Sequence, residues 1–359
     1  MKRRLAIVYA VFATVLLVAG FLLVFVFAYP DIRQTVYAML GMLAGFVFAP
    51  IVHELGHVCM GAAVKMDCVY VKCFCFRISL KKGRKRFSFA SPFSADETQV
   101  VPKEGGNISK RASVYTMGGL LFGGMLLILV FAAAIVCSCL GKTIFFLWGT
   151  VPYCGYLFLL NLPPLEYASG KTDTLVWMGI RKGYDAERNM LAAMEIQGRL
   201  SEGFSFSEIE RELYYDVPQL SEEEPLYAVM LDLRYRYHLE RGELAKAAEV
   251  LNRIVQAQEY LSEAEAQRIA AELTYMHSLN GDIERAEESS KLSRAFLAGE
   301  SVTAKRVLAT FSVAAGKTEA VGVLLAQAEK ALREERIAGV RKFEEILLSR
   351  IKSAEMGNT

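Results

Sequence analysis

Four long apolar runs occupy most of the first 165 residues of this 359-residue chain. The first run, at 5–29, contains no charged residue. A helix of this length rises about 1.5 Å per residue and crosses about 30 Å of hydrocarbon. Three further runs follow at 35–64, 114–140 and 144–165. The pattern therefore predicts a bundle of about four membrane-spanning helices.

The pattern changes between the second and third runs, at 66–110. Residues 68–80 and 86–89 alternate and are rich in β-branched and aromatic side chains, which is typical of strands. Between them, the sequence Lys-Lys-Gly-Arg-Lys at 81–85 combines a glycine with positive charges, which is typical of an exposed turn. We expect a small β-hairpin here, followed by a loop as far as 109.

From 184 onward the chain is mixed in charge and rich in Ala, Glu, Leu and Arg. Three segments, 227–256, 266–297 and 302–332, each contain a helical pattern that stops at a glycine and soon resumes. The glycines are 39 and 35 residues apart, at Gly242, Gly281 and Gly316. A tetratricopeptide unit has about 34 residues, so these segments resemble tetratricopeptide helix pairs. An unrelated helical bundle is the alternative.

These patterns predict a mainly α protein with two domains. Residues 1–183 form a polytopic membrane domain that includes the hairpin, and 184–359 form a soluble α-helical repeat domain. The chain is 53% hydrophobic, which is high for a soluble protein, so the lipid bilayer is an expected partner. The formal net charge of +2 gives no reason to expect a nucleic-acid partner.

The distribution of Lys and Arg predicts the orientation in the membrane. Basic residues are concentrated at the N-terminus, in 65–111 and after the fourth run, whereas the links at 31–34 and 141–142 carry little charge. With four spans the three basic parts lie on one side, and positive charge favours the cytoplasm. We expect a multi-pass protein of a bacterial plasma membrane, with both termini and the C-terminal domain in the cytoplasm.

The second apolar run contains the sequence His53-Glu54-Leu55-Gly56-His57. In a helix, residues four apart lie on one face, so His53 and His57 can bind one Zn²⁺, with Glu54 beside them as a general base. Ionisable side chains are costly in an apolar helix unless they pair or bind something. The alternative is two helix histidines that are satisfied by packing.

A catalytic zinc ion needs a third protein ligand and one open position for water. The seven cysteines include no Cys-x-x-Cys pair and offer no cysteine zinc site. The fourth run is interrupted at Asn161-Leu162-Pro163-Pro164, where a regular helix cannot continue. Two carboxylates follow this break, Glu166 and Asp173, and either one is a candidate ligand.

Residues 35–181 resemble the site-2 protease family of intramembrane zinc metalloproteases. The resemblance rests on the histidine motif in a membrane helix and on the later segment with Asn161, Pro164 and Asp173. It implies that Asp173 is the third zinc ligand and that Glu54 is the catalytic base. It also implies that Asn161 binds the substrate backbone.

Two features depart from the family pattern. Thr174 follows Asp173, where the family usually has glycine, and the third run has Gly118-Gly119-Leu120-Leu121-Phe122-Gly123 in place of the family's Gly-Pro-x-x-Asn. Gly119 and Gly123 have the spacing that lets membrane helices approach closely. This spacing favours plain helix packing or a role in shaping the site.

The resemblance implies a zinc metalloendopeptidase that cleaves a membrane-anchored protein or peptide. An extended substrate segment could pair with the edge of the predicted hairpin, and the region at 184–359 could bind a protein partner or substrate tail. The alternative is a non-catalytic membrane scaffold that retains the metal motif. A zinc transporter is disfavoured, because the spans offer almost no other intramembrane carboxylates or histidines.

Overall fold

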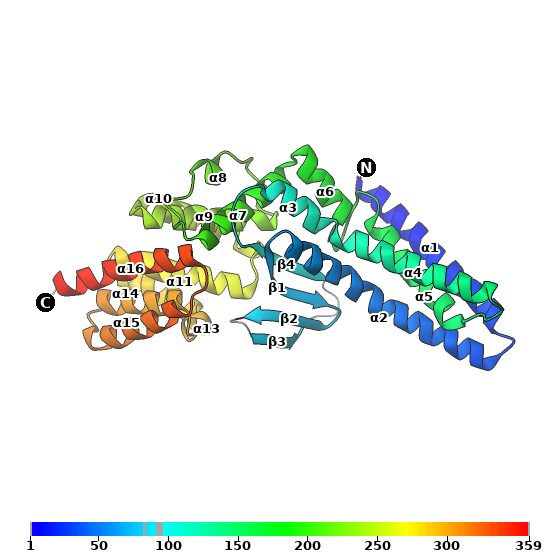
Figure 1. Cartoon of the computed structure of the whole chain (residues 1–359). Coiled ribbons are helices and arrows are strands. Elements are labelled where there is room, and N and C mark those ends of the chain that lie inside the picture. Colours follow the sequence, from blue (N-terminus) through cyan, green and yellow to red (C-terminus); the bar gives the residue numbers. More distant parts are fainter. Residues whose placement is uncertain (1, 82–83, 91–95, 358–359) are drawn as a thin grey trace. The chain divides into compact units, whose positions relative to one another are not determined.

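The computed structural model describes residues 2–81, 84–90 and 96–357 (Figure 1). It is mainly helical, as predicted, with 72% helix. The chain forms two compact units. The first comprises Met1–Val101 and Asn107–Glu187, and the second comprises Pro102–Gly106 and Arg188–Thr359. The second unit therefore contains a five-residue segment that the sequence assigned to the membrane domain.

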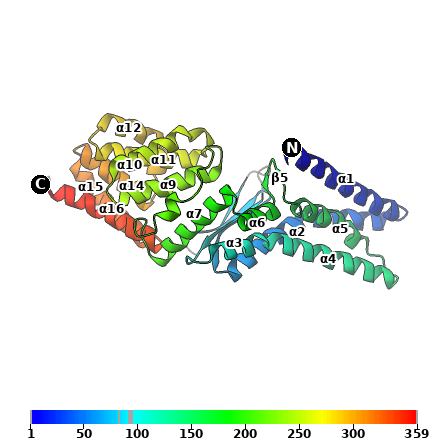
Figure 2. The same ribbon diagram turned by 90° about the horizontal axis from the view of Figure 1, so that it is seen from above.

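Among the described residues, three helical stretches are long and apolar enough to cross a membrane, namely Arg4–Ala28, Ile32–Ala63 and Ile108–Cys139. They comprise α1 (Lys2–Ala28), α2 (Ile32–Ala63), α3 (Ile108–Thr116) and α4 (Gly118–Cys139). The fourth apolar run forms the 17-residue helix α5 (Phe145–Asn161), which packs against α1, α2 and α4 (Figures 1 and 2). Many large apolar side chains on α1, α2 and α4 are exposed, which suits a lipid-facing surface.

A small sheet follows α2, with the strand order β3-β2-β1-β4. Its strands are β1 (Met66–Cys73), β2 (Phe76–Lys81), β3 (Arg84–Phe89) and β4 (Glu97–Pro102). β1 and β2 are antiparallel, with Tyr70 opposite Ser79, and β2 and β3 are antiparallel, with Ile78 opposite Phe87. The turn predicted at 81–85 includes Lys82 and Gly83, which lie outside the described residues.

The structure corrects two details of the predicted hairpin. Residues 68–80 do not form one strand, because the chain turns at Phe74, whose φ is +53°. The Asp96 carboxylate stabilises this turn by accepting a hydrogen bond of 2.7 Å from the Phe74 backbone N–H. Residues 97–102, predicted as loop, form β4 beside β1. The turn at Phe74 contains neither glycine nor proline, and its partner is distant in sequence, so no local pattern indicates it.

Helices build the second unit, and they form pairs where the sequence predicts them. α9 packs on α10, α11 on α12 and α14 on α15. The first helix of each pair ends two residues before a glycine, Gly242, Gly281 or Gly316. These glycines have φ of 73°, 73° and 70°, a backbone conformation that glycine adopts without strain. The bounds are α7 (Asp185–Glu202), α8 (Glu212–Tyr215), α9 (Pro225–Glu240), α10 (Leu244–Gln256), η1 (Gln258–Tyr260), α11 (Glu263–Leu279), α12 (Ile283–Leu292), α13 (Arg294–Leu297), α14 (Val302–Ala314), α15 (Thr318–Arg333) and α16 (Ala338–Gly357).

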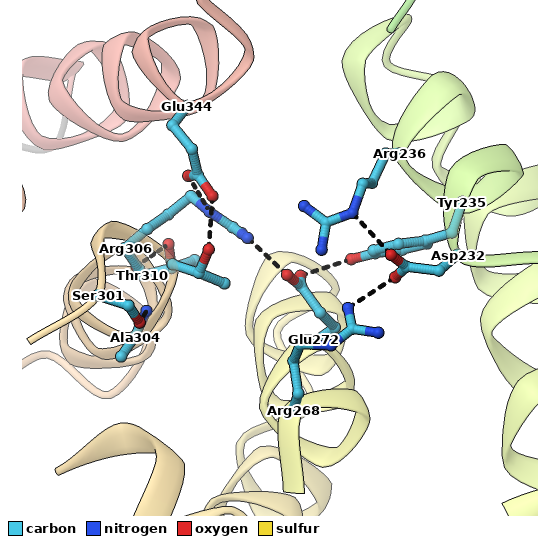
Figure 3. A network of polar contacts seen from close by, with 11 residues as sticks. Asp232, Tyr235, Arg236, Arg268, Glu272, Ser301, Ala304, Arg306, Thr310 and Glu344 are labelled. Carbon is cyan, nitrogen blue, oxygen red and sulfur yellow. Dashed lines mark hydrogen bonds and ion pairs between the residues drawn. The ribbon is translucent and has the colours of Figure 1, made fainter. Parts of the chain in front are cut away.

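A buried polar network connects four of these helices (Figure 3). Arg306 on α14 is fully buried, and its guanidinium pairs with Glu272 on α11 and Glu344 on α16, each at 2.8 Å. The Tyr235 hydroxyl on α9 donates to the other oxygen of Glu272 at 2.8 Å. Buried charges are retained only where partners compensate their lost hydration, so Arg306 holds α11 and α16 in a fixed relation.

A second set of ion pairs extends this network on α9 and α11. Asp232 accepts hydrogen bonds from Arg236 at 3.0 Å and Arg268 at 2.8 Å. Burial alone would raise the pKa of Asp232, but the two guanidinium groups outweigh it and hold the pKa at about 2. The carboxylate therefore stays charged at neutral pH.

We expect Arg306→Met to lower the free energy of unfolding of the helical unit by about 3–5 kcal/mol. The substitution keeps an unbranched apolar stem but leaves Glu272 and Glu344 buried without their cation. The matched control is Arg285→Met, because Arg285 is 71% exposed in its pair with Asp282; it should cost about 0.5 kcal/mol or less. Thermal unfolding of the full chain, followed by circular dichroism, measures both. Equal shifts would mean that the buried network contributes no stability.

Candidate metal centre

Two histidines of α2 point toward one carboxylate. His53 and His57 are one helical turn apart and are buried, with exposures of 9% and 7%. Their Nε2 atoms lie 3.3 Å and 3.4 Å from the two carboxylate oxygens of Asp173. One ligand atom from each of the three residues lies within 4.8 Å of the others. The structure thus brings together the three residues that the sequence analysis named as zinc ligands.

Asp173 is placed by the segment that follows the broken helix α5. It is the first residue of α6 (Asp173–Lys182), and the preceding Thr172 side chain caps this helix by accepting from the Leu175 N–H at 3.2 Å. The Thr172 hydroxyl also donates to the Pro163 carbonyl at 2.9 Å. The Thr174 hydroxyl donates to the Asn161 carbonyl at 2.9 Å. Thr174 therefore ties α6 to the end of α5.

The donor set fits a divalent metal ion. Oδ2 of Asp173 is buried and has no hydrogen-bond partner among the described residues, and an unsatisfied buried carboxylate oxygen is costly. Nδ1 of His57 lies 3.0 Å from the Tyr115 carbonyl oxygen, which can only accept, so Nδ1 carries the proton. Nε2 of His57 is then free to bind a metal. Two imidazoles and one carboxylate match a three-ligand zinc site.

Glu54 is buried beside this group, with an exposure of 5%. Its Oε2 accepts a hydrogen bond of 2.6 Å from the hydroxyl of Thr98 on β4. The Tyr115 hydroxyl in turn donates to the Thr98 backbone carbonyl. Thr98 and Tyr115 are missing from the sequence analysis, because β4 is not predicted and the carbonyl of Tyr115 has no sequence signal.

Glycines of α4 give the histidines their space. α2 and α4 approach so closely at Gly56 and Gly118 that a Cβ on either would meet the other's carbonyl oxygen at 2.5 Å or less. A Cβ on Gly119 would lie 2.5 Å from Nε2 of His53 and equally close to Nε2 of His57. Of the two roles considered for these glycines, Gly119 therefore combines helix packing with shaping the site.

Asn161 and Glu166 lie in different surroundings. Asn161 ends α5, and its side chain donates to the Leu157 carbonyl at 3.2 Å. It lines a cavity of about 10 Å³ together with His53 and Gly119, which is room for about one water molecule. Glu166 is exposed on the two-residue strand β5 (Glu166–Tyr167), which pairs with β6 (Gly170–Lys171). Of the two carboxylates considered as third ligand, only Asp173 lies beside the histidines.

Comparisons with known proteins do not assign this chain to a family. No protein-family model, curated protein or solved structure matches it. The site is defined by its own chemistry. Two buried histidines lie on a helix that is long and apolar enough to cross a membrane, and a partly buried aspartate lies beside them.

Proposed function

We propose that this chain is an intramembrane zinc metalloprotease that resembles the site-2 proteases. One observation supports the proposal above all others: Asp173 meets the α2 histidines, and Glu54 adjoins them on the same helix. In this proposal His53, His57 and Asp173 hold Zn²⁺. A bound zinc ion would supply an activated water and polarise the carbonyl of the scissile peptide bond.

Glu54 performs the proton transfers in this mechanism. Its carboxylate takes a proton from the attacking water and returns it to the amine that leaves. The hydrogen bond from Thr98 to Oε2 fixes the orientation of the carboxylate and leaves Oε1 for the water. The Asn161 side chain borders the cavity beside His53, where it can contact a substrate carbonyl after releasing Leu157.

The substrate class that fits is a membrane-anchored protein or peptide with a locally extended segment. A regular helix hides its peptide bonds, so the substrate must unwind before cleavage. β3 is an edge strand of the sheet, and edge strands accept an added strand through backbone hydrogen bonds. The helical second unit resembles tetratricopeptide pairs and recruits a partner or substrate tail.

The membrane arrangement in this proposal has four spans. α5 has 17 residues, which give about 26 Å at 1.5 Å per residue, close to the thickness of the hydrocarbon core. It packs against α1, α2 and α4, which supports a fourth span beside them. Four spans put both termini on the cytoplasmic side of a bacterial plasma membrane.

Metal analysis of the purified protein tests the proposal. We expect the wild type to bind about one Zn²⁺ per chain. Gly119→Ala should weaken zinc binding about tenfold or more, because the new Cβ would lie 2.5 Å from both Nε2 atoms. Gly155→Ala is the matched control, since its Cβ would make only an ordinary contact of 3.9 Å with Leu127. A wild type that binds no zinc, or a Gly119→Ala protein that binds it normally, would contradict the proposed site.

A further inference from the structure

A five-residue segment, 102–106, begins with the last residue of β4, leads toward α3 and belongs to the second unit. We call it the strap. The chain passes from the first unit into the strap after Val101 and returns at Asn107. A segment this short stays with the second unit only if contacts hold it there. An unbound loop of five residues would lie beside the strand and helix that flank it.

Helix α7 supplies these contacts. The backbone N–H of Gly106 donates to Glu195 at 2.8 Å, and that of Gly105 donates to Glu202 at 3.0 Å. The Ser201 hydroxyl donates to the Pro102 carbonyl at 3.1 Å. Three residues of the strap, Pro102, Gly105 and Gly106, are therefore hydrogen-bonded to α7.

The strap and α7 are also packed without spare room. A Cβ on Gly198 of α7 would lie 2.6 Å from the Glu104 carbonyl oxygen and 2.8 Å from the Gly105 nitrogen. A Cβ on Gly105 would lie 2.6 Å from Oε1 of Glu195. At Gly198 the added Cβ would meet strap backbone, so any residue larger than glycine there would displace the strap. At Gly105 the added Cβ would meet the ends of the Glu195 and Arg199 side chains, which would have to move.

Both neighbours of the strap contact the metal centre. On one side, β4 carries Thr98, whose hydroxyl bonds to Glu54. On the other side, α3 carries Tyr115, whose carbonyl accepts from His57, and Arg111, which donates to the Val64 carbonyl at the end of α2. α7 is connected to the third ligand as well, because it follows α6, which begins at Asp173.

We propose that α7 positions the metal centre through the strap, so that the second unit sets the affinity of the site for zinc. Glu195, Gly198 and Glu202 are positioning residues in this scheme, and a partner that shifts α7 regulates the site. This inference rests on the proposed zinc site for its functional consequence. Its mechanical part, the transmission from α7 to β4 and α3, does not depend on a metal.

The test compares Gly198→Ala and Glu195→Ala with Gly322→Ala in the full chain. Gly322 lies on α15 with nothing within 4 Å of an added Cβ, so it is the control for a glycine-to-alanine change in a helix. Amide hydrogen exchange is measured for residues 96–101 and 107–117, and Zn²⁺ affinity is measured by chelator competition. Alanine is the better helix former, so faster exchange in Gly198→Ala would come from the strap and not from weaker helix propensity.

We expect about tenfold faster exchange in both segments and about tenfold weaker Zn²⁺ binding in Gly198→Ala and Glu195→Ala, with neither change in Gly322→Ala. Exchange that rises only within 102–106 and α7 would overturn the inference. If exchange rises in both segments but no protein binds Zn²⁺, the transmission stands and the proposed function fails. Should Gly198→Ala not fold, Glu195→Ala alone decides, because it removes an acceptor without adding bulk.

Discussion

Glu54→Gln is expected to abolish peptide-bond hydrolysis while leaving zinc bound. Glutamine has the size of glutamate, and its amide oxygen can still accept the hydrogen bond from Thr98. It cannot take a proton from water at neutral pH, and the loss of a general base costs about 10²–10⁴-fold in rate. Because Glu54 is not in the ligand group of His53, His57 and Asp173, the zinc content should not change.

The measurement uses the protein in lipid vesicles with a fluorescent peptide that contains one transmembrane helix. Glu345→Gln is the matched control, because Glu345 is exposed on α16 and the change in charge is the same. Cleavage that persists in Glu54→Gln would contradict the assigned base. A wild type that binds zinc and cleaves no membrane-anchored peptide would favour the alternative, a scaffold that retains the metal motif.

Asp173→Ala is expected to weaken zinc binding about 100-fold or more. The substitution removes the one carboxylate of the ligand group found among the described residues and leaves two imidazoles to hold the ion. Glu166→Ala should leave zinc binding unchanged, because Glu166 is exposed on β5. Dialysis against a competing chelator, followed by metal analysis, compares the two variants with the wild type.

Asp173→Asn separates charge from shape in the same experiment. It keeps an oxygen ligand but removes the negative charge, and its affinity should fall between those of the wild type and Asp173→Ala. Loss of zinc in Glu166→Ala with retention in Asp173→Ala would reverse the assignment of the third ligand. Thermal unfolding of each variant shows whether a loss of zinc comes from the missing ligand or from a misfolded protein.

Local signals account for most of what the sequence predicted. Three apolar runs predicted α1, α2 and α4, because a helix long enough to cross a membrane needs an uninterrupted apolar stretch. The fourth run predicted a helix, and it forms the 17-residue α5. The three spaced glycines, Gly242, Gly281 and Gly316, marked helix ends because only glycine adopts their φ without strain. The i, i+4 spacing of His53 and His57 placed two donors on one face.

The contacts around the site have no such signal. Asp96 stabilises the turn at Phe74, Thr98 orients Glu54, and the carbonyl of Tyr115 fixes the tautomer of His57. Each pair joins segments that are 22 to 58 residues apart. A pattern of apolar and polar positions carries no information about such partners. Each of these contacts depends on one particular side chain or carbonyl group, and not on a periodic spacing of residues.

The sequence by itself determined the helical class, the apolar helices, the paired helices of the second half and the histidine face of α2, because these depend on neighbours within a turn or two. Only the tertiary structure decided that Asp173 and not Glu166 lies beside the histidines, that Gly119 makes room for both imidazoles, and that 102–106 is held by α7. These depend on close packing between distant segments, where tenths of an ångström separate a fit from a clash.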